Sequence, residues 1–311
     1  MWRLNAQVFD IVAVGHLCMD SIHLPNKRKP FLGLGGSSAY VSIVAKRLGA
    51  NVSVISKVGE DFPEAYVKQL AHEGVDLSTV VMAKGSLTTS FELKYNSDLS
   101  SRTLQLKNRA PSIRVDDLPK TLNTKVIHVG PIAGEVDYEV IEQLRKFSDL
   151  LSLDPQGLLR NFDENGHVIQ GLMADRRVLE LIDVYKSSLD EIKAITNAST
   201  PNSAIKTVHD YGTKTVIVTL GMAGAIISHE NSVYNISAHK PVNVVDTTGA
   251  GDAFIGAFLA EHVKGKELLW CACAGSAAAS LVVEAVGITF SGDEEEVYRR
   301  ARVVYEKGIK Q

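Results

Sequence analysis

Short runs of β-branched and other apolar residues alternate along this chain with segments of helical spacing. The apolar runs have the length and composition of buried strands, and they span residues 9–15, 51–59, 125–130, 150–154, 181–188 and 214–221. The segments with helical spacing span residues 37–49, 134–147 and 203–212. A strand followed by a helix, repeated in this way, predicts an α/β fold of the Rossmann-like, three-layer αβα type. We expect its central, mostly parallel sheet to be covered by helices on both faces.

Two stretches depart from this alternation. Residues 17–25 and 87–106 look like antiparallel strands, and the second stretch reads as a hairpin that turns at residues 96–101. Neither stretch is followed by a helix, so neither fits the parallel sheet. They predict a small β-sheet lid at the edge of the main sheet, formed by about residues 17–29 and 87–106.

The last quarter of the chain has a different composition. It is rich in Gly and Ala after residue 239, and residues 250–286 read as two long helices whose small residues permit close packing. No linker or internal repeat interrupts the sequence. We therefore expect residues 1–311 to form a single domain that includes the lid.

The composition excludes several classes of partner. The formal net charge is −3 with both signs interspersed, which gives no basic surface for nucleic acid and favours small-molecule ligands. No apolar run reaches the roughly 18 residues of a membrane helix. The three cysteines lack the spacing of a disulfide framework or a metal site; they are Cys18, Cys271 and Cys273. We therefore expect a cytoplasmic protein that binds neither nucleic acid nor membranes.

The segment DTTGAGDAFIGAF at residues 246–258 carries the clearest chemistry. We expect a strand that ends at Val245, a loop of small residues, Gly249–Ala250–Gly251, and an amphipathic helix that starts at about Asp252. Glycines let backbone N–H groups approach a phosphate, and the first turn of a helix offers unpaired donors to an anion. Asp252 on that turn is either the N-cap of the helix or a base that accepts a proton during phosphoryl transfer.

The same segment resembles, almost letter for letter, the carboxy-terminal signature of the ribokinase-like (PfkB) carbohydrate kinases. The resemblance extends over essentially the whole chain. It implies transfer of the γ-phosphoryl group of ATP, with Mg²⁺, to a hydroxyl of a sugar or related polyol by direct in-line displacement. Gly249, Ala250 and Gly251 would form the anion hole, and Asp252 would be the general base.

The amino-terminal signature of the family is also present, at residues 34–62. By resemblance, the residues that bind the acceptor would be Asp20, Gly35, Gly36, Ser37 and Tyr40. Tyr40 stands where members usually have Asn, and Ser37 stands where ribokinase has Lys, which argues against ribose. A hexose, a sugar acid, a cyclitol and a nucleoside all stay open as acceptors.

The donor side resembles the family through VTLGMAGAI at residues 218–226 and SLDE at residues 188–191. The second string corresponds to the family's Asn-x-x-Glu motif with Ser in place of Asn, and it implies that Glu191 binds Mg²⁺ through water. The implied nucleotide-binding residues are Ser188, Thr219, Gly221, Gly224 and Ser276. The positions that surround an activating monovalent cation such as K⁺ in several relatives are Asp246, Thr248, Gly287 and Ser291.

Relatives in this family often dimerise through their lids. We therefore expect a homodimer in which apolar lid residues, such as Leu93, Tyr95 and Leu104, take part.

Other classes of protein fit the sequence less well than a kinase or stay open beside it. A dehydrogenase is disfavoured because GLGG at residues 33–36 does not directly follow the first strand, and a Walker-type NTPase because the chain has no G-x-x-x-x-G-K-[ST]. No two of the nine histidines have the spacing of a metal site. A sugar-binding or nucleotide-binding sensor with weak catalysis stays open, since several contacts differ from the family pattern.

Overall fold

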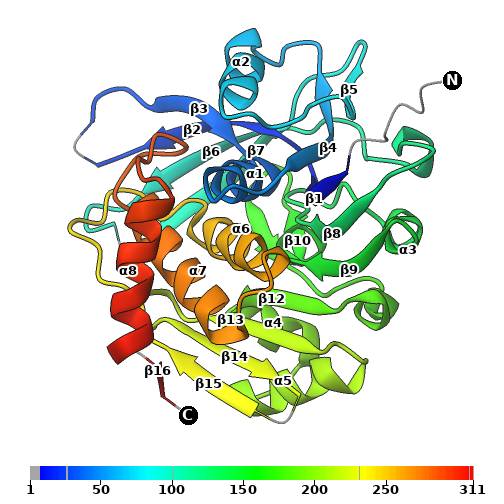
Figure 1. Ribbon diagram of the computed structural model, residues 1–311. Helices are drawn as coiled ribbons and strands as arrows, with labels where there is room; N and C mark the ends of the chain where they lie inside the picture. Colours follow the sequence, from blue (N-terminus) through cyan, green and yellow to red (C-terminus); the bar gives the residue numbers. More distant parts are fainter. Residues whose placement is uncertain (1–7, 26, 100, 231, 308, 311) are drawn as a thin grey trace, which may run out of the picture.

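The main sheet is built largely from the apolar runs of the sequence. The computed structural model describes residues 8–25, 27–99, 101–230, 232–307 and 309–310. Within these ranges its strands are β1 (Phe9–Val14), β4 (Val52–Gly59), β5 (Val80–Ala83), β8 (Thr124–Val129), β9 (Ser148–Leu153), β12 (Val184–Ser188), β13 (Thr215–Thr219), β14 (Ala225–His229), β15 (Ser232–Ile236) and β16 (Ile309–Lys310). They lie in the order β16-β15-β14-β13-β12-β9-β8-β1-β4-β5 (Figure 1). Neighbours from β13 to β5 are parallel, and β14, β15 and β16 add an antiparallel extension.

Helices cover both faces of this sheet, as the alternation predicted. One face carries α1 (Ser37–Arg47), α2 (Glu64–His72), α6 (Ala250–Val263), α7 (Leu268–Val282) and α8 (Glu294–Lys307). The other face carries α3 (Tyr138–Arg145), α4 (Leu189–Thr196) and α5 (Pro201–Asp210) (Figure 1). Strand β1 shows why: Ile11 and Ala13 belong to the first apolar core, whereas Val12 and Val14 belong to the second. The three-layer αβα fold is confirmed. No helix in the described ranges is both long and apolar enough to cross a bilayer.

A second, four-stranded sheet lies beside the main one, and we call it the lid. Its strands are β2 (Cys18–His23), β3 (Phe31–Gly35), β6 (Ser90–Tyr95) and β7 (Arg102–Asn108), in the order β3-β2-β6-β7. The predicted hairpin is present as β6 and β7. The predicted antiparallel character is wrong for one pair, because β2 and β6 run parallel. Strand β3, the antiparallel partner of β2, was not predicted. Residues 26 and 100 of the predicted lid lie outside the described residues.

The lid has its own small apolar cluster, which faces the main sheet. Leu93 and Tyr95 are buried in it, together with Ile132 from the loop after β8. These two lid side chains therefore pack within the monomer. The prediction that they help to form a dimer surface is not supported by their burial. Leu32 on β3 is instead the strongly exposed apolar side chain of the lid, at 69%.

Three local predictions around α6 and α3 are corrected by the structure. Residues 237–249 form no strand, because the Val245 N–H binds the Val283 carbonyl at the end of α7 rather than a neighbouring strand. Helix α6 starts at Ala250 and is not amphipathic, since residues 253–261 are all buried between α1, α7 and the sheet. Helix α3 starts only at Tyr138, where Asp137 caps its first turn by accepting from the Val140 N–H.

Several elements were not anticipated. They include α2, α4, α8, the antiparallel strands β14 and β15, and a short hairpin of β10 (Arg160–Phe162) and β11 (Val168–Gln170). The hairpin follows a single turn of 3-10 helix, η2 (Gln156–Leu158), which comes directly after β9. It matters for function because η2 and β10 lie at the carboxyl end of a central strand, where parallel sheets place their ligand sites.

Candidate active site

The first turn of α6 is held in place by glycine. Gly249 is the N-cap with φ 76°, and a Cβ there would lie 2.2 Å from the Tyr40 ring. Only glycine fits this position without strain. Since Gly249 is the N-cap, the alternative in which Asp252 caps the helix is wrong. Neither the Gly251 N–H nor the Asp252 N–H has a hydrogen-bond partner among the described residues, so both are available to an anion.

A small polar cavity opens on one side of this turn. Its volume is about 70 Å³, and its lining residues are Cys18, Asp20, Gly36, Ser37, Tyr40, Phe91, Leu93, Arg102, Leu104, Ile132, Gln156, Arg160, Thr248, Gly249 and Asp252. We call it the polar cavity. It brings together Asp20 from the lid and Asp252 from α6, which are far apart in the sequence. Four of the five predicted acceptor-binding residues line it, and the fifth, Gly35, lies directly behind Asp20.

Asp20 is buried, although a single aspartate on a small sheet would ordinarily be solvated. Its Oδ1 accepts from the Cys18 thiol at 3.2 Å, and a Cβ on Gly35 would lie 2.0 Å from its Oδ2. Gly35 therefore makes room for the carboxyl group. Burial raises the pKa of Asp20 to about 6, although the Cys18 hydrogen bond and the Arg102 charge act to lower it.

Two hydroxyl groups of the polar cavity lack partners. The Oγ of Ser37 and the phenol oxygen of Tyr40 are buried and form no hydrogen bond with any described residue. Buried polar groups are normally hydrogen-bonded, so these two hydroxyl groups are exceptions among the residues that line the polar cavity. Ser37 begins α1 directly after Gly36, whose φ of 98° and close approach to the His16 carbonyl again require glycine.

The residues that approach Asp252 were not predicted. Gln156 donates from Nε2 to Asp252 Oδ1 at 3.2 Å and accepts at Oε1 from Arg160 Nη2 at 2.8 Å. Arg160 also donates to the Ile132 carbonyl at 2.9 Å. The signal that could have found them is LDPQGLLR at residues 153–160, which follows a buried strand of the parallel sheet.

A second, apolar cavity of about 350 Å³ lies on the other side of the same turn. All five predicted nucleotide-binding residues line it: Ser188, Thr219, Gly221, Gly224 and Ser276. Its remaining lining residues are Met222, Ala238, Thr247, Ala250, Gly251, Phe254, Ala279, Ser280 and Val283. Gly221 and Gly224 both have positive φ in a tight turn, so they have a structural reason to be glycine as well as a place in the cavity.

The start of α6 thus separates the two cavities. Gly249 and Asp252 face the polar cavity, whereas Ala250 and Gly251 face the apolar one. The ammonium group of Lys186 lies beside this partition, because a Cβ on Gly251 would be 2.5 Å from its Nζ.

Lys186 was not predicted. It is buried and forms an ion pair with Asp154 at 2.5 Å. Burial acts to lower the pKa of Lys186, but the nearby carboxylates of Asp154, Asp252 and Glu191 outweigh it and raise the pKa. A fixed positive charge therefore lies next to the unpaired N–H groups of α6.

Glu191 is positioned by a capping box at the start of α4. Its Oε2 accepts from the Ser188 N–H and hydroxyl, both at 2.7 Å, while the Ser188 hydroxyl accepts from the Glu191 N–H. Oε1 has no partner among the described side chains and main-chain groups. Mg²⁺ keeps several waters and needs only one or two carboxylates beside the phosphates, so a single free oxygen fits a water-mediated contact. Among the described residues, no three His, Cys, Asp or Glu side chains cluster as a direct metal site.

The residues predicted around a monovalent cation are arranged differently. Asp246 Oδ1 accepts from the Tyr95 hydroxyl at 2.6 Å, and Oδ2 accepts from the Gly287 N–H at 2.8 Å. The Thr248 hydroxyl accepts from Arg102 Nη1 at 2.7 Å, and the same nitrogen lies 4.0 Å from Asp246 Oδ1. The Asp246 carboxylate thus accepts hydrogen bonds from protein groups. The nearby positive charge is the guanidinium group of the lid residue Arg102.

Ser291 lies apart from this group. It is exposed and lines a separate surface depression with Arg47 and Phe290. The structure thus brings together Asp246, Thr248 and Gly287 but not Ser291. Among the described residues, the side-chain oxygens of Asp246 and Thr248 accept hydrogen bonds from protein donors.

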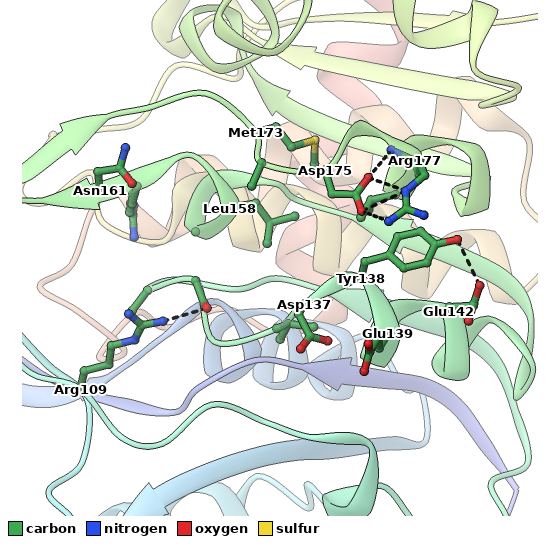
Figure 2. A pocket seen from close by; sticks show the side chains of 17 residues that line it. Arg109, Asp137, Tyr138, Glu139, Glu142, Leu158, Asn161, Met173, Asp175 and Arg177 are labelled. Atoms are coloured by element: carbon green, nitrogen blue, oxygen red, sulfur yellow. Dashed lines mark hydrogen bonds and ion pairs between the residues drawn. The ribbon is translucent and has the colours of Figure 1, made fainter.

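A larger open groove of about 860 Å³ lies next to the polar cavity (Figure 2). It runs between the segment around α3 and the segment 157–178. Figure 2 shows Tyr138 beside Arg177, whose guanidinium is paired with Asp175. Arg160 lines both this groove and the polar cavity, so the two are adjacent.

The sequence of this chain is similar to those of known kinases, which agrees with the geometry of the site. Residues 8–295 match the model of the pfkB family carbohydrate kinases. The chain is 31% identical over 279 residues to an ATP-dependent 6-phosphofructokinase of Thermoanaerobacterium thermosaccharolyticum, covering 84% of this chain and 83% of that one. It is 28% identical over 267 residues to a cytidine kinase of Thermococcus kodakarensis, covering 85% of this chain and 92% of that one.

The fold has solved counterparts. A pyrophosphate-dependent kinase in the ribokinase family, solved as a sulfate complex, superposes with a TM-score of 0.80 at 24% identity, covering 93% of this chain and 99% of that one. At that identity the likeness concerns the fold alone. Together with the family match, these findings show that the chain belongs to the PfkB family of carbohydrate kinases and has the ribokinase-like fold. It is thus a phosphotransferase of the class that uses a hydroxyl group as acceptor.

Proposed function

We propose that this chain transfers the γ-phosphoryl group of ATP to a hydroxyl of a sugar or related polyol. One observation carries the proposal: the first turn of α6 separates a polar cavity that holds Asp20 and Asp252 from an apolar cavity suited to a nucleotide. The polar cavity binds the acceptor, and the apolar cavity binds the donor. The phosphoryl group is then transferred from the apolar cavity to the polar cavity past the first turn of α6, which lines both.

The mechanism assigns separate tasks to the residues at this partition. Asp252 accepts the proton of the attacking hydroxyl as the new bond to the γ-phosphorus forms, the bond from that phosphorus to the β,γ-bridging oxygen breaks, and ADP leaves. The N–H groups of Gly251 and Asp252 and the Lys186 ammonium stabilise negative charge on the phosphoryl oxygens. Bound Mg²⁺, held through water by Glu191, would neutralise charge on the phosphates. The lid excludes water, which would otherwise compete as acceptor.

The polar cavity favours an acceptor with several hydroxyl groups. A buried carboxylate such as Asp20 can accept from two neighbouring hydroxyls at once, and the unpartnered Ser37 and Tyr40 oxygens can bond to further hydroxyls. The relatives include kinases named for cytidine, inositol and fructose. A nucleoside or a cyclitol therefore stays the alternative acceptor within the same reaction.

The apolar cavity favours a nucleoside triphosphate over pyrophosphate as donor. Phe254, Met222 and Val283 offer surface that an adenine ring can contact, and pyrophosphate has no group to use it. One solved relative is pyrophosphate-dependent, so both donors belong in the assay.

The test is a comparison of wild type with Asp252→Asn on a panel of sugars, cyclitols and nucleosides. Phosphorylated product is measured directly, with ATP or pyrophosphate and Mg²⁺. We expect Asp252→Asn to lower kcat by about 10²- to 10⁴-fold and to change the Kd of ATP by less than about twofold. Asp163→Asn, in the turn between β10 and β11, is the matched control and should retain wild-type turnover.

A second candidate is a sensor with weak catalysis. Ser188 and Ser276 replace the Asn that the family usually has, and a hydroxyl offers the nucleotide fewer hydrogen-bonding groups than an amide does. Tight binding of ATP and of an acceptor without turnover in wild type would favour the sensor and contradict the kinase proposal.

The remaining expectations are proposals of the same kind. The three cysteines are buried and form no disulfide with one another, which supports a cytoplasmic location. Magnesium dependence is tested by removing the metal with EDTA and restoring it. No step of the mechanism uses a monovalent cation.

A homodimer through the lid would have to use surfaces such as that around Leu32, and sedimentation velocity of wild type and Leu32→Ser tests it.

A further inference from the structure

Gln156 connects two charged groups of the polar cavity through its side-chain amide. It begins η2 directly after β9, and its main-chain N–H binds Asp154 Oδ1 at 3.2 Å. Its side chain lies between Arg160 and Asp252, with contacts of 2.8 Å and 3.2 Å. These are the only side-chain hydrogen bonds of Gln156 to described residues.

The hydrogen-bonding groups on either side of the Gln156 side-chain amide determine which of its atoms faces Arg160. A guanidinium group can only donate hydrogen bonds, so the atom of Gln156 that faces Arg160 must be the oxygen. The NH₂ group must then face Asp252. The flipped amide would place two sets of N–H groups against each other and a carbonyl oxygen against a carboxylate.

Arg160 is itself held from two sides. It donates to the Ile132 carbonyl at 2.9 Å, and its guanidinium carbon lies 6.0 Å from the centre of the Phe91 ring on lid strand β6. A continuous series of contacts thus runs from the lid through Arg160 and Gln156 to Asp252.

The consequence for Asp252 is that its two oxygens differ. Oδ1 accepts from Gln156, whereas Oδ2 has no protein partner in the described part of the chain. We infer that Gln156, oriented by Arg160, is a positioning residue that holds the Asp252 carboxylate so that Oδ2 faces the acceptor hydroxyl. This inference rests on the proposed function, because it takes Asp252 as the base.

A rival role for Gln156 is simple acceptor binding, since it lines the same cavity. The two roles predict different kinetics. A positioning residue changes the rate of the chemical step, so kcat falls while the acceptor KM stays nearly constant. A residue that only binds the acceptor raises the acceptor KM and leaves kcat unchanged.

The experiment compares the steady-state kinetics of Gln156→Leu, Gln156→Glu and Arg160→Met. Gln156→Leu removes a hydrogen bond to a charged group, so kcat should fall about 10- to 100-fold, with the ATP and acceptor KM values within about twofold of wild type. Gln156→Glu keeps the contact to Arg160 but turns a carboxylate oxygen toward Asp252, and kcat should fall at least as far. Arg160→Met should lower kcat by about 3- to 10-fold. Gln143→Leu on α3, whose side chain lines neither cavity, is the control and should match wild type.

A double-mutant cycle separates positioning from a general loss of structure. If Gln156 acts through Asp252, Gln156→Leu should change the residual kcat of Asp252→Asn by less than about twofold. Multiplicative losses in the double variant, or a raised acceptor KM with unchanged kcat in Gln156→Leu, would overturn the inference. Wild-type turnover in Asp252→Asn would instead refute the proposed function. The two failures are therefore distinguishable.

Discussion

The buried carboxyl group of Asp20 should make the protein less stable as the pH rises. Its folded-state pKa is about 6, against 3.8 for an ordinary aspartate. Because the folded-state value is the higher one, the unfolded chain loses this proton first. The cost is absent below pH 4, grows between about pH 4 and 6, and is constant above that range.

The magnitude follows from the same pKa values. At about 1.4 kcal/mol per tenfold change in proton affinity, a pKa raised from 3.8 to about 6 costs the folded state about 3 kcal/mol once Asp20 is ionised. The variant Asp20→Asn cannot ionise and escapes this cost. Its free energy of unfolding, relative to wild type, should therefore rise by about 2 kcal/mol between pH 4 and pH 7. Its acceptor binding should be lost.

The assay is urea unfolding of both proteins without ligand at several pH values from 4 to 8. Taking the difference at each pH cancels the other titrating groups, which are shared. Asp163→Asn is the control of opposite sign, because the His167 main-chain N–H holds the pKa of Asp163 below its usual value. That control should become less stable relative to wild type as the pH rises to about 5, and the difference should stay constant above that pH. A difference between Asp20→Asn and wild type that stays flat or falls with rising pH would refute the reasoning.

Three further substitutions test the packing around the site. Gly249→Ala places a methyl group against the Tyr40 ring on a residue with positive φ. The free energy of unfolding should fall by about 1–3 kcal/mol in thermal unfolding. An unchanged midpoint would show that this position is not strained by a side chain. Tyr95→Phe removes the hydroxyl that donates to buried Asp246 and should cost about 1–3 kcal/mol in urea unfolding; a neutral effect would show that the lid is not anchored there. Arg300→Met removes a buried guanidinium on α8 that donates to Ser280 on α7 and to Glu284 just after it, as well as to Glu296 on its own helix. A loss of about 1.5–3 kcal/mol is expected by calorimetry, and an unchanged stability would show that these bonds are solvated.

The parallel core of the fold could be predicted because both faces of its strands are buried. Such strands have apolar runs that are visible without any partner, as in residues 125–130. The importance of the segment Gly249–Ala250–Gly251 could also be predicted, because close packing and the positive φ of Gly249 require small residues there, although the predicted loop is the N-cap and first turn of α6. The positions of Asp20 and Asp252 on one cavity agree with the family pattern, which the residues alone could not have supplied.

What could not be predicted depends on partners distant in the sequence. Strand β3 pairs with β2 only because the lid folds back. The segment that ends at Val245 looks like a strand, but the Val245 N–H bonds to the Val283 carbonyl just after α7. Gln156 and Arg160 form a chain of contacts that ends on a helix almost a hundred residues later. Side-chain networks of this kind carry no local periodicity, so pattern reasoning has no signal for them.

The partition of the site by one helical turn has a consequence for how its specificity can change. Side chains that line the polar cavity come from the lid, from α1 and from the segments after β8 and β9, whereas the main chain at the start of α6 lies between the two cavities. Exchanging side chains leaves a main-chain spacing intact. New acceptors can therefore be selected by mutating residues such as Leu104 or Ile132 without rebuilding the geometry of phosphate transfer.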